Sequence, residues 1–322
     1  MTTRNQTMVM EFILIGFYNF LDLQTMLFGV FSIMYMVTLV ANIMLIIIII
    51  IIRINHSLPM YFFLSVLSFS ETYYIFVVVP NMLANLLNEE GTIFSTGCAI
   101  QMFFFIALGG TNCMLLAVMG YYRYVAICKP LHYQVLMNQR ICNQLVVFSS
   151  ITRFILSLID THFIFRLPFC GPRKINHYFC DMSPVIKLTC TENNVIGTVI
   201  FIFCIVVVFG PFLLILLSYV FILNTILKIP SAEGKHKAFS TCVFHLIVVV
   251  MHFGCASIVY LRPNSTYSLD QDTLISVIYT VVTPLLNPMV YSLRNKDLQV
   301  ALRKALGRKI FRSRQHSSMA GT

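Results

Sequence analysis

Long apolar stretches alternate with short polar ones along this chain of 322 residues. A helix needs about 20 consecutive apolar residues to cross the roughly 30 Å hydrocarbon layer of a membrane. Stretches of that length occupy residues 27–52, 59–86, 98–125, 141–165, 195–226, 238–260 and 272–292. The pattern therefore predicts an all-α membrane protein, built as a bundle of seven transmembrane helices.

Basic residues gather where the odd-numbered predicted helices end, at Arg53, Arg123, Lys129, Arg140, Lys228, Lys235 and Lys237. Another basic run lies after residue 292. Cytosolic segments of membrane proteins carry the excess of Lys and Arg, so these segments are predicted to be cytosolic. We therefore expect an extracellular amino-terminal tail (1–26), a seven-helix domain (27–292) and a basic cytosolic carboxyl-terminal tail (293–322).

The composition excludes an ordinary soluble domain. Hydrophobic residues make up 58% of the chain and charged residues 11%, whereas a soluble domain has about 25% charged residues. The net charge of +10 lies mostly on the predicted cytosolic margin, where anionic membrane lipid is the nearer partner. We expect contact with membrane lipid and no binding of nucleic acid.

Four cysteines fall on the predicted extracellular side. Cys98 opens the third helix, and Cys170, Cys180 and Cys190 lie between the fourth and fifth. Four cysteines in an oxidising compartment predict two disulfides, which would make this loop a lid over the bundle. The sequence alone does not fix the pairing.

No metal or cofactor is expected. His177, Cys180 and Asp181 lie close together in sequence, but a cysteine held in a disulfide cannot be a thiolate ligand. His245 and His252 are better interpreted as groups that line the bundle.

The third helix presents two functional regions on one face. Cys98 and Arg123 are separated by about 37 Å of helix, which is a full crossing. Phe105 and Arg123 lie about five turns apart and so share a face, together with Gly109 and Asn112. The outer half offers an apolar surface of ligand size, and the inner end presents a cation.

Two charges fall within predicted membrane helices, where a charge is a functional hypothesis by default. Glu71 is expected near Asn42 and Asn287, as a polar cluster that holds sodium or water, or as a protonated carboxyl. Arg153 has no partner that the sequence reveals, at a cost of about 2.5 kcal/mol or more. Pro288 should kink the seventh helix, because it removes a backbone donor.

Two glycosylation sequons begin at Asn5 and Asn264, on predicted extracellular segments. A third begins at Asn55 on a predicted cytosolic segment, where the modifying enzyme does not act.

Several runs resemble mammalian olfactory receptors, at residues 11–17, 59–71, 119–133, 167–173, 237–246 and 284–295. The resemblance covers essentially the whole chain. It implies a rhodopsin-like G-protein-coupled receptor, not an enzyme, in the plasma membrane of olfactory sensory neuron cilia. Such a receptor would bind small volatile odorants in the outer half of the bundle and activate a stimulatory G protein to raise cyclic AMP.

The resemblance also implies roles for individual residues. It favours the disulfides Cys98–Cys180 and Cys170–Cys190, with Cys98–Cys190 as the alternative. The implied ligand pocket contains Phe105, Ile106, Gly109, Gly110, Phe203, Val207, Ala256, Ser257, Tyr260, Val277 and Thr280. The implied coupling and activation residues are Tyr122, Arg123, Tyr124, Tyr219, Lys237, Asn287, Pro288 and Tyr291.

The chain departs from the family pattern at several positions. Tyr122 replaces the acid that would pair with Arg123, and further departures occur at Ser150, Arg153, Phe244 and His252. One alternative is therefore a degenerate, poorly coupled or non-functional receptor copy. A transporter or channel is the alternative from another class, although the chain shows no internal repeat of the kind common in transporters.

Overall fold

The computed structural model describes residues 10–17, 23–55, 59–88, 91–170, 173–190, 194–260 and 269–294. The predicted sequons at Asn5 and Asn264 and the tail after residue 294 lie outside the described residues. So do the side chains of Phe203, Lys237 and Tyr260.

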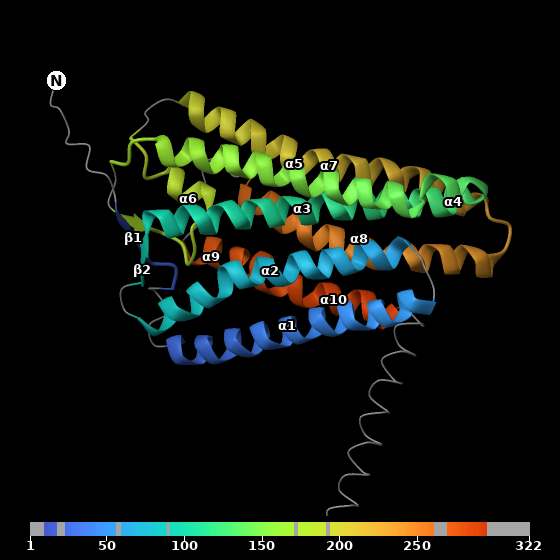
Figure 1. The fold of residues 1–322 in the computed structure, drawn as a ribbon, viewed down its shortest axis with the longest axis horizontal. Helices are drawn as coiled ribbons and strands as arrows, with labels where there is room; N and C mark the ends of the chain where they lie inside the picture. The colour runs from blue at the N-terminus through green and yellow to red at the C-terminus, as the bar shows by residue number, and fades with distance from the viewer. Residues whose placement is uncertain are drawn as a thin grey trace, which may run out of the picture.

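Seven helices of the described chain are long and apolar enough to cross a membrane. The first six are α1 (Gln24–Asn55), α2 (Pro59–Leu87), α3 (Ser95–Cys128), α5 (Gln139–Arg166), α7 (Asn194–Lys228) and α8 (Ala232–Tyr260). The seventh is divided into α9 (Leu269–Val277), η3 (Ile278–Val282) and α10 (Thr283–Arg294). These helices run side by side in one elongated bundle (Figure 1). The predicted seven-helix architecture is confirmed.

The central helix is α3, which contacts α2, α5 and α7. Its predicted functional face is buried from Phe105 through Gly109 and Asn112 to Arg123. The peripheral helices instead leave large apolar side chains on the outside, such as Phe148 of α5. An exposed apolar side chain meets lipid in a membrane, so this surface needs no protein partner.

The seventh helix contains a π-helical segment, η3. The backbone N–H of Thr283 bonds to the carbonyl of Ile278, five residues earlier, and the Thr283 hydroxyl donates to the same oxygen over 3.1 Å. Pro284 follows directly and has no N–H to continue the regular pattern. The irregular segment is thus placed by the sequence, two residues before Pro284.

A three-stranded sheet lies at one end of the bundle, in the order β2-β1-β3. Strand β1 (Glu11–Leu14) pairs antiparallel with β2 (Gly91–Phe94) and parallel with β3 (Lys174–Ile175). Phe12 of β1 is buried, and its ring centroid lies 5.4 Å from that of Phe169. The expected amino-terminal tail therefore contains an ordered strand that the sequence analysis did not predict.

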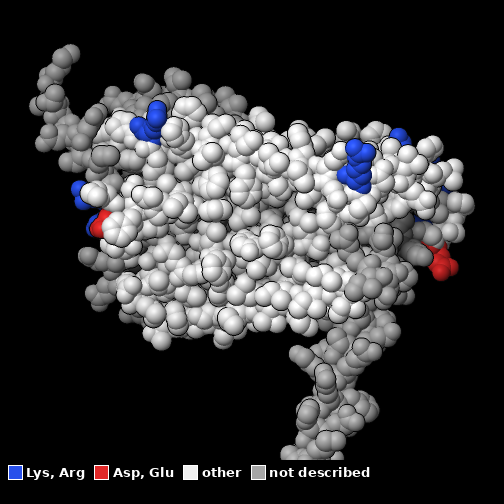
Figure 2. Space-filling view, in the orientation of Figure 1, with Lys and Arg blue, Asp and Glu red and all other residues white. Residues whose placement is uncertain are grey.

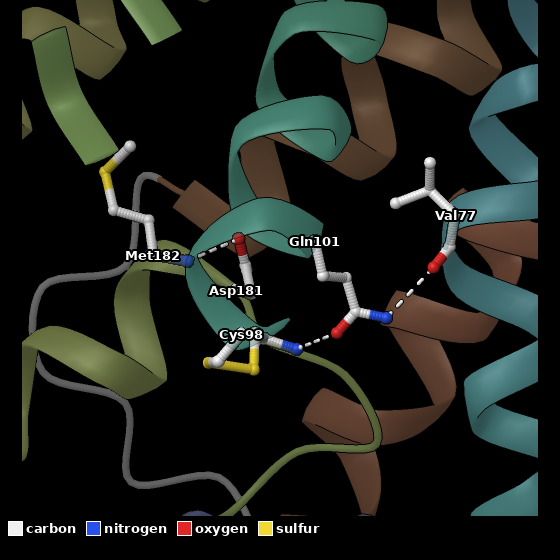
Figure 3. The surroundings of a disulfide bond; sticks show 6 residues. Val77, Cys98, Gln101, Asp181 and Met182 are labelled. Atoms are coloured by element: carbon white, nitrogen blue, oxygen red, sulfur yellow. Dashed lines mark hydrogen bonds between the residues drawn. A yellow bond between two sulfur atoms is a disulfide. The ribbon is translucent and has the colours of Figure 1, made fainter. Parts of the chain in front are cut away.

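The structure joins Cys98 to Cys180 and Cys170 to Cys190, with Cα–Cα distances of 5.4 and 5.0 Å. This is the pairing that the resemblance favours. Around the first disulfide, Gln101 of α3 donates to the Val77 carbonyl and accepts from the backbone N–H of Cys180, each over 3.0 Å (Figure 3). The disulfide and Gln101 together fasten the loop to α3.

We call this end of the bundle, with the two disulfides and the sheet, the disulfide end. The opposite end carries the 3-10 helix η2 (Pro130–His132) and the short helix α4 (Tyr133–Leu136). Lys, Arg, Asp and Glu appear near the two ends of the face shown in Figure 2, and the surface between them is uncharged. That band has the character of a lipid-facing surface.

Candidate functional site

A cavity of about 60 Å³ lies among α3, α5, α7, α8 and η3, with the short helix α6 (Met182–Ile186) at its edge. This is space for a few water molecules, so a larger ligand would have to enlarge the cavity as it binds. The wall is mostly apolar. Its residues are Phe105, Ile106, Gly109, Gly110, Cys113, Asp160, Met182, Val207, Val208, Ala256 and Tyr279.

The cavity brings together part of the predicted pocket, namely Phe105, Ile106, Gly109, Gly110, Val207 and Ala256. Three other predicted residues are not in its wall. The Ser257 hydroxyl bonds to the Phe253 carbonyl of its own helix over 2.6 Å. Val277 is buried in the apolar core, and Thr280 bonds to Tyr178. The role of the whole set in ligand binding stays a prediction.

The loop after β3 forms a lid of aromatic residues. The Phe179 ring packs on Phe105 of the cavity wall, at 4.6 Å between centroids. The Tyr178 hydroxyl lies 2.7 Å from that of Thr280, and His177 Nε2 lies 3.0 Å from the Ser276 hydroxyl. These bonds connect the lid to the seventh helix.

His177 of the lid is a buried neutral base. Burial lowers the pKa of His177 from its ordinary value to about 3. Its Nδ1 atom is buried and has no hydrogen-bond partner among the described residues. The lid therefore contains a group whose protonation would destabilise the folded loop.

Beside the cavity, Cys113 Sγ lies 3.3 Å from Nε2 of His252. The His252 ring also packs near Tyr279, at 5.9 Å between centroids. Within the described part of the chain, no three His, Cys, Asp or Glu side chains gather as metal ligands.

Arg153 has partners that the sequence analysis did not find. Its Nη2 donates to the Val207 carbonyl of α7 over 3.1 Å. Its side chain passes close to Gly110 of α3, where an added Cβ would lie 2.9 Å from Arg153 Cδ. The expectation of an unpaired arginine is therefore wrong, because the acceptor is a backbone carbonyl that no side-chain pattern reveals.

Five residues of the cavity wall were not predicted from the sequence, namely Cys113, Asp160, Met182, Val208 and Tyr279. The charged residue among them is Asp160. It lies seven residues after Arg153, which is about two helical turns, so both share one face of α5. The two groups interact electrostatically but do not form a close ion pair. The available signal was this spacing of two opposite charges on one predicted helix.

The polar cluster around Glu71 is assembled in part. Asn287 Nδ2 donates to Glu71 Oε1. Asn42 does not bond to Glu71, because its amide donates to the carbonyls of Thr38 over 3.1 Å and of Pro284 over 3.4 Å. Glu71 Oε2 and Asn42 Oδ1 are buried without a hydrogen-bond partner in the described structure.

At the opposite end, the Tyr122 hydroxyl lies 2.5 Å from that of Tyr133. Because Tyr133 begins α4, this contact connects the short helix to α3. Burial raises the pKa of Tyr133 above its ordinary value, which favours its neutral phenol. The adjacent Arg123 is buried.

A second hydrogen-bonded group links α3, α7 and α8. His245 Nε2 lies 3.1 Å from the Leu116 carbonyl, and Nδ1 lies 2.8 Å from the Tyr219 hydroxyl. A carbonyl only accepts, so Nε2 carries the proton and Tyr219 donates to Nδ1. From the sequence, His245 was expected to line the bundle, but this link was not predicted.

The remaining predicted coupling residues are placed as follows. The Tyr124 ring lies 5.8 Å from Phe221 of α7, and Lys129 Nζ lies 5.9 Å from the Tyr124 ring centre. Pro288 is inside α10. Tyr291 is buried, and its hydroxyl has no hydrogen-bond partner among the described residues.

Comparisons with known proteins agree with this architecture. A family model described as "Olfactory receptor" matches residues 31–309. Human olfactory receptor 10R2 is 54% identical over 305 residues, which cover 95% of this chain and 91% of that protein. Human olfactory receptor 10T2 is 53% identical over 301 residues, covering 94% and 95%. Mouse olfactory receptor 5AP2 is 50% identical over 303 residues, covering 94% and 95%.

Proposed function

Because the chain belongs to the olfactory receptor family, we propose that it binds a small volatile odorant in the described cavity and activates a stimulatory G protein, raising cyclic AMP. Membership of this family makes the chain a multi-pass membrane receptor and not an enzyme. A transporter or channel function has no support from the relatives.

The observation that carries the proposal is the cavity itself. Small-molecule sites are concave and mostly apolar, with a few placed polar groups. The wall of this cavity has that character, since Phe105, Val207 and Ala256 supply apolar surface and Tyr279 supplies a hydroxyl. Its position against α3 also gives a route for coupling, because α3 continues from the cavity to Arg123 at the opposite end.

We place the disulfide end outside the cell. Disulfides persist in oxidising compartments, and both disulfides lie at this end. Asn5 and Asn264 would then meet the glycosylating enzyme, and the opposite end would meet the G protein and anionic lipid in the plasma membrane. The resemblance adds olfactory cilia as the location.

The cluster of Glu71, Asn287 and Asn42 is proposed to hold sodium or water. The two buried oxygens without partners, Glu71 Oε2 and Asn42 Oδ1, support a guest at this place, because a buried polar atom without a hydrogen bond is costly.

The test is ligand-evoked cyclic AMP at matched surface level, in cells that also supply olfactory chaperones. Gly109→Leu should abolish the response, because Gly109 lines the cavity and an added Cβ would already lie 3.3 Å from the Tyr279 hydroxyl. Gly29→Leu in α1 is the matched control, since nothing lies within 4 Å of a Cβ there.

An unchanged dose response of Gly109→Leu would contradict the location of the site. Normal surface level without a response to any odorant would instead favour the alternative of a poorly coupled or non-functional copy. Ion flux in the same cells distinguishes a channel.

A further inference from the structure

The wall of the cavity contains a hydrogen-bond acceptor that receives no hydrogen bond. Among the described residues that line it, Asp160 alone is charged. Asp160 Oδ2 is buried and has no hydrogen-bond partner in the described structure. A buried acceptor of this kind is costly unless a donor reaches it. Cys113 and Tyr279 carry the other side-chain donors of the wall, but neither bonds to Asp160 Oδ2 in the described structure, so a molecule in the cavity can supply the donor.

Arg153 balances the charge of Asp160 without using that oxygen. The two residues interact electrostatically along one face of α5. The hydrogen bond of the guanidinium goes to the Val207 carbonyl, however, and Gly110 leaves room for the arginine side chain to reach it. The carboxyl and guanidinium groups together are close to neutral, while Oδ2 stays available.

We propose that Asp160 accepts a hydrogen bond from an uncharged hydroxyl donor, so that the ligands of this receptor are small alcohols or phenols. This inference rests on the proposed odorant function and names the ligand class. A neutral donor satisfies the oxygen and leaves the charges balanced. An ammonium ligand would leave an extra positive charge in apolar surroundings, which is costly. A ligand with no donor would leave the oxygen unpaired, and sites built around such a group discriminate strongly against it.

Four probes of matched size separate these cases: hexanol, methyl pentyl ether, heptane and hexylamine. Binding is measured as thermal stabilisation of the full chain in detergent, and signalling as cyclic AMP in cells. For the wild type we expect hexanol to bind at least about tenfold more tightly than the ether, which is the value of a hydrogen bond to a charged group. The ether keeps the size and an oxygen but has no donor.

Two substitutions at Asp160 attribute the preference to its carboxyl group. In Asp160→Leu the ratio of hexanol to ether affinity should fall to about one. Asp160→Asn keeps an acceptor oxygen and should retain part of the ratio. Leu158→Ala is the control on the same helix, because Leu158 is 60% exposed on the outer surface, and it should leave the ratio unchanged.

Arg153→Met tests the charge balance. Without the guanidinium, the carboxyl group of Asp160 becomes an unbalanced anion, so the affinity for hexylamine relative to hexanol should rise by roughly tenfold. An amine preference already present in the wild type would overturn the proposed class.

The two readouts separate this inference from the proposed function. If hexanol binds selectively through Asp160 but evokes no cyclic AMP, the ligand class stands and the coupling proposal fails. Equal binding of hexanol and ether by the wild type overturns the inference, even if the Asp160 variants do not fold. Absence of hexanol binding, or a preference unchanged in a folded Asp160→Leu protein, overturns it as well.

Discussion

The two ends of the bundle are held by different kinds of bond. At the disulfide end, Cys98–Cys180 and Cys170–Cys190 are covalent, and backbone hydrogen bonds join β1 to β2 and β3. At the opposite end, single side-chain contacts such as Tyr122–Tyr133 and Tyr219–His245 join neighbouring helices. A hydrogen bond is worth about 1 kcal/mol net. The first end is therefore suited to a fixed recognition surface, and the second to an equilibrium between arrangements.

Breaking the covalent bonds should have the largest effect. Cys98→Ser and Cys180→Ser should each cause intracellular retention, because loss of a disulfide typically costs about 2–5 kcal/mol. The double variant should be no worse than either single variant, since all three lose the same bond. Surface staining of an amino-terminally tagged receptor measures this.

Cys255→Ser is the control for these variants, because Cys255 is a free thiol; it should reach the surface normally. Additive losses in the double variant would mean that Cys98 and Cys180 belong to different disulfides, as in the Cys98–Cys190 alternative.

Acid should loosen the lid at the disulfide end. The pKa of His177 is about 3 in the folded protein and about 6.5 in an unfolded chain. Between these values the unfolded state binds more protons, so stability falls as the pH falls below about 6.5. The loss should reach roughly 2 kcal/mol at pH 5, and thermal unfolding in detergent at pH 7.5 and pH 5 measures it.

His177→Gln should flatten this pH dependence, because the amide does not titrate, whereas the exposed His162 at the same end offers a control. If His162→Gln removes the slope and His177→Gln leaves it intact, the lid histidine is not the titrating group.

The sequence predicted the helices of both ends but not most of the bonds between them. Apolar length alone defined the seven spans, because each helix satisfies its own backbone in the membrane. Strand β1 is four residues long and depends on partners at Gly91–Phe94 and Lys174–Ile175, so local pattern could not reveal it. The bonds of Arg153 to the Val207 carbonyl and of His245 to the Leu116 carbonyl use backbone acceptors, which every residue offers equally. The seven-residue spacing of Arg153 and Asp160, which places both on one face of a helix, could have been recognised in the sequence but was not.

Removing the hydrogen bond between Tyr219 and His245, at the opposite end of the bundle, should raise basal signalling. Tyr219→Phe removes the hydroxyl that donates to His245 and leaves Nδ1 buried without that donor. A buried unsatisfied group costs about 1–3 kcal/mol. If a cost of about 1.5 kcal/mol falls on the resting arrangement of α3, α7 and α8, the ratio of active to resting receptor rises roughly tenfold. Basal cyclic AMP per surface receptor should rise by the same factor.

Tyr121→Phe is the control for Tyr219→Phe. It removes a hydroxyl from an exposed tyrosine at the same end and keeps the ring contact with Tyr124. Equal basal output from both variants would show that the His245 link does not hold the resting arrangement.

The smallest effect is expected at position 122, where the resemblance implies an acidic residue and this chain has Tyr122. Tyr122→Asp places a carboxylate next to Arg123 and removes the neutral contact between the phenols of Tyr122 and Tyr133. Charge-assisted hydrogen bonds are about twice as strong as neutral ones, a gain of roughly 1 kcal/mol. Basal cyclic AMP per surface receptor should fall about fivefold. Tyr133→Phe separates the gain of the carboxylate from the loss of this contact: if Tyr122→Asp still lowers basal output in the Tyr133→Phe background, the ion pair with Arg123 carries the effect. Unchanged basal output at matched surface level in both backgrounds would mean that position 122 does not set the resting state.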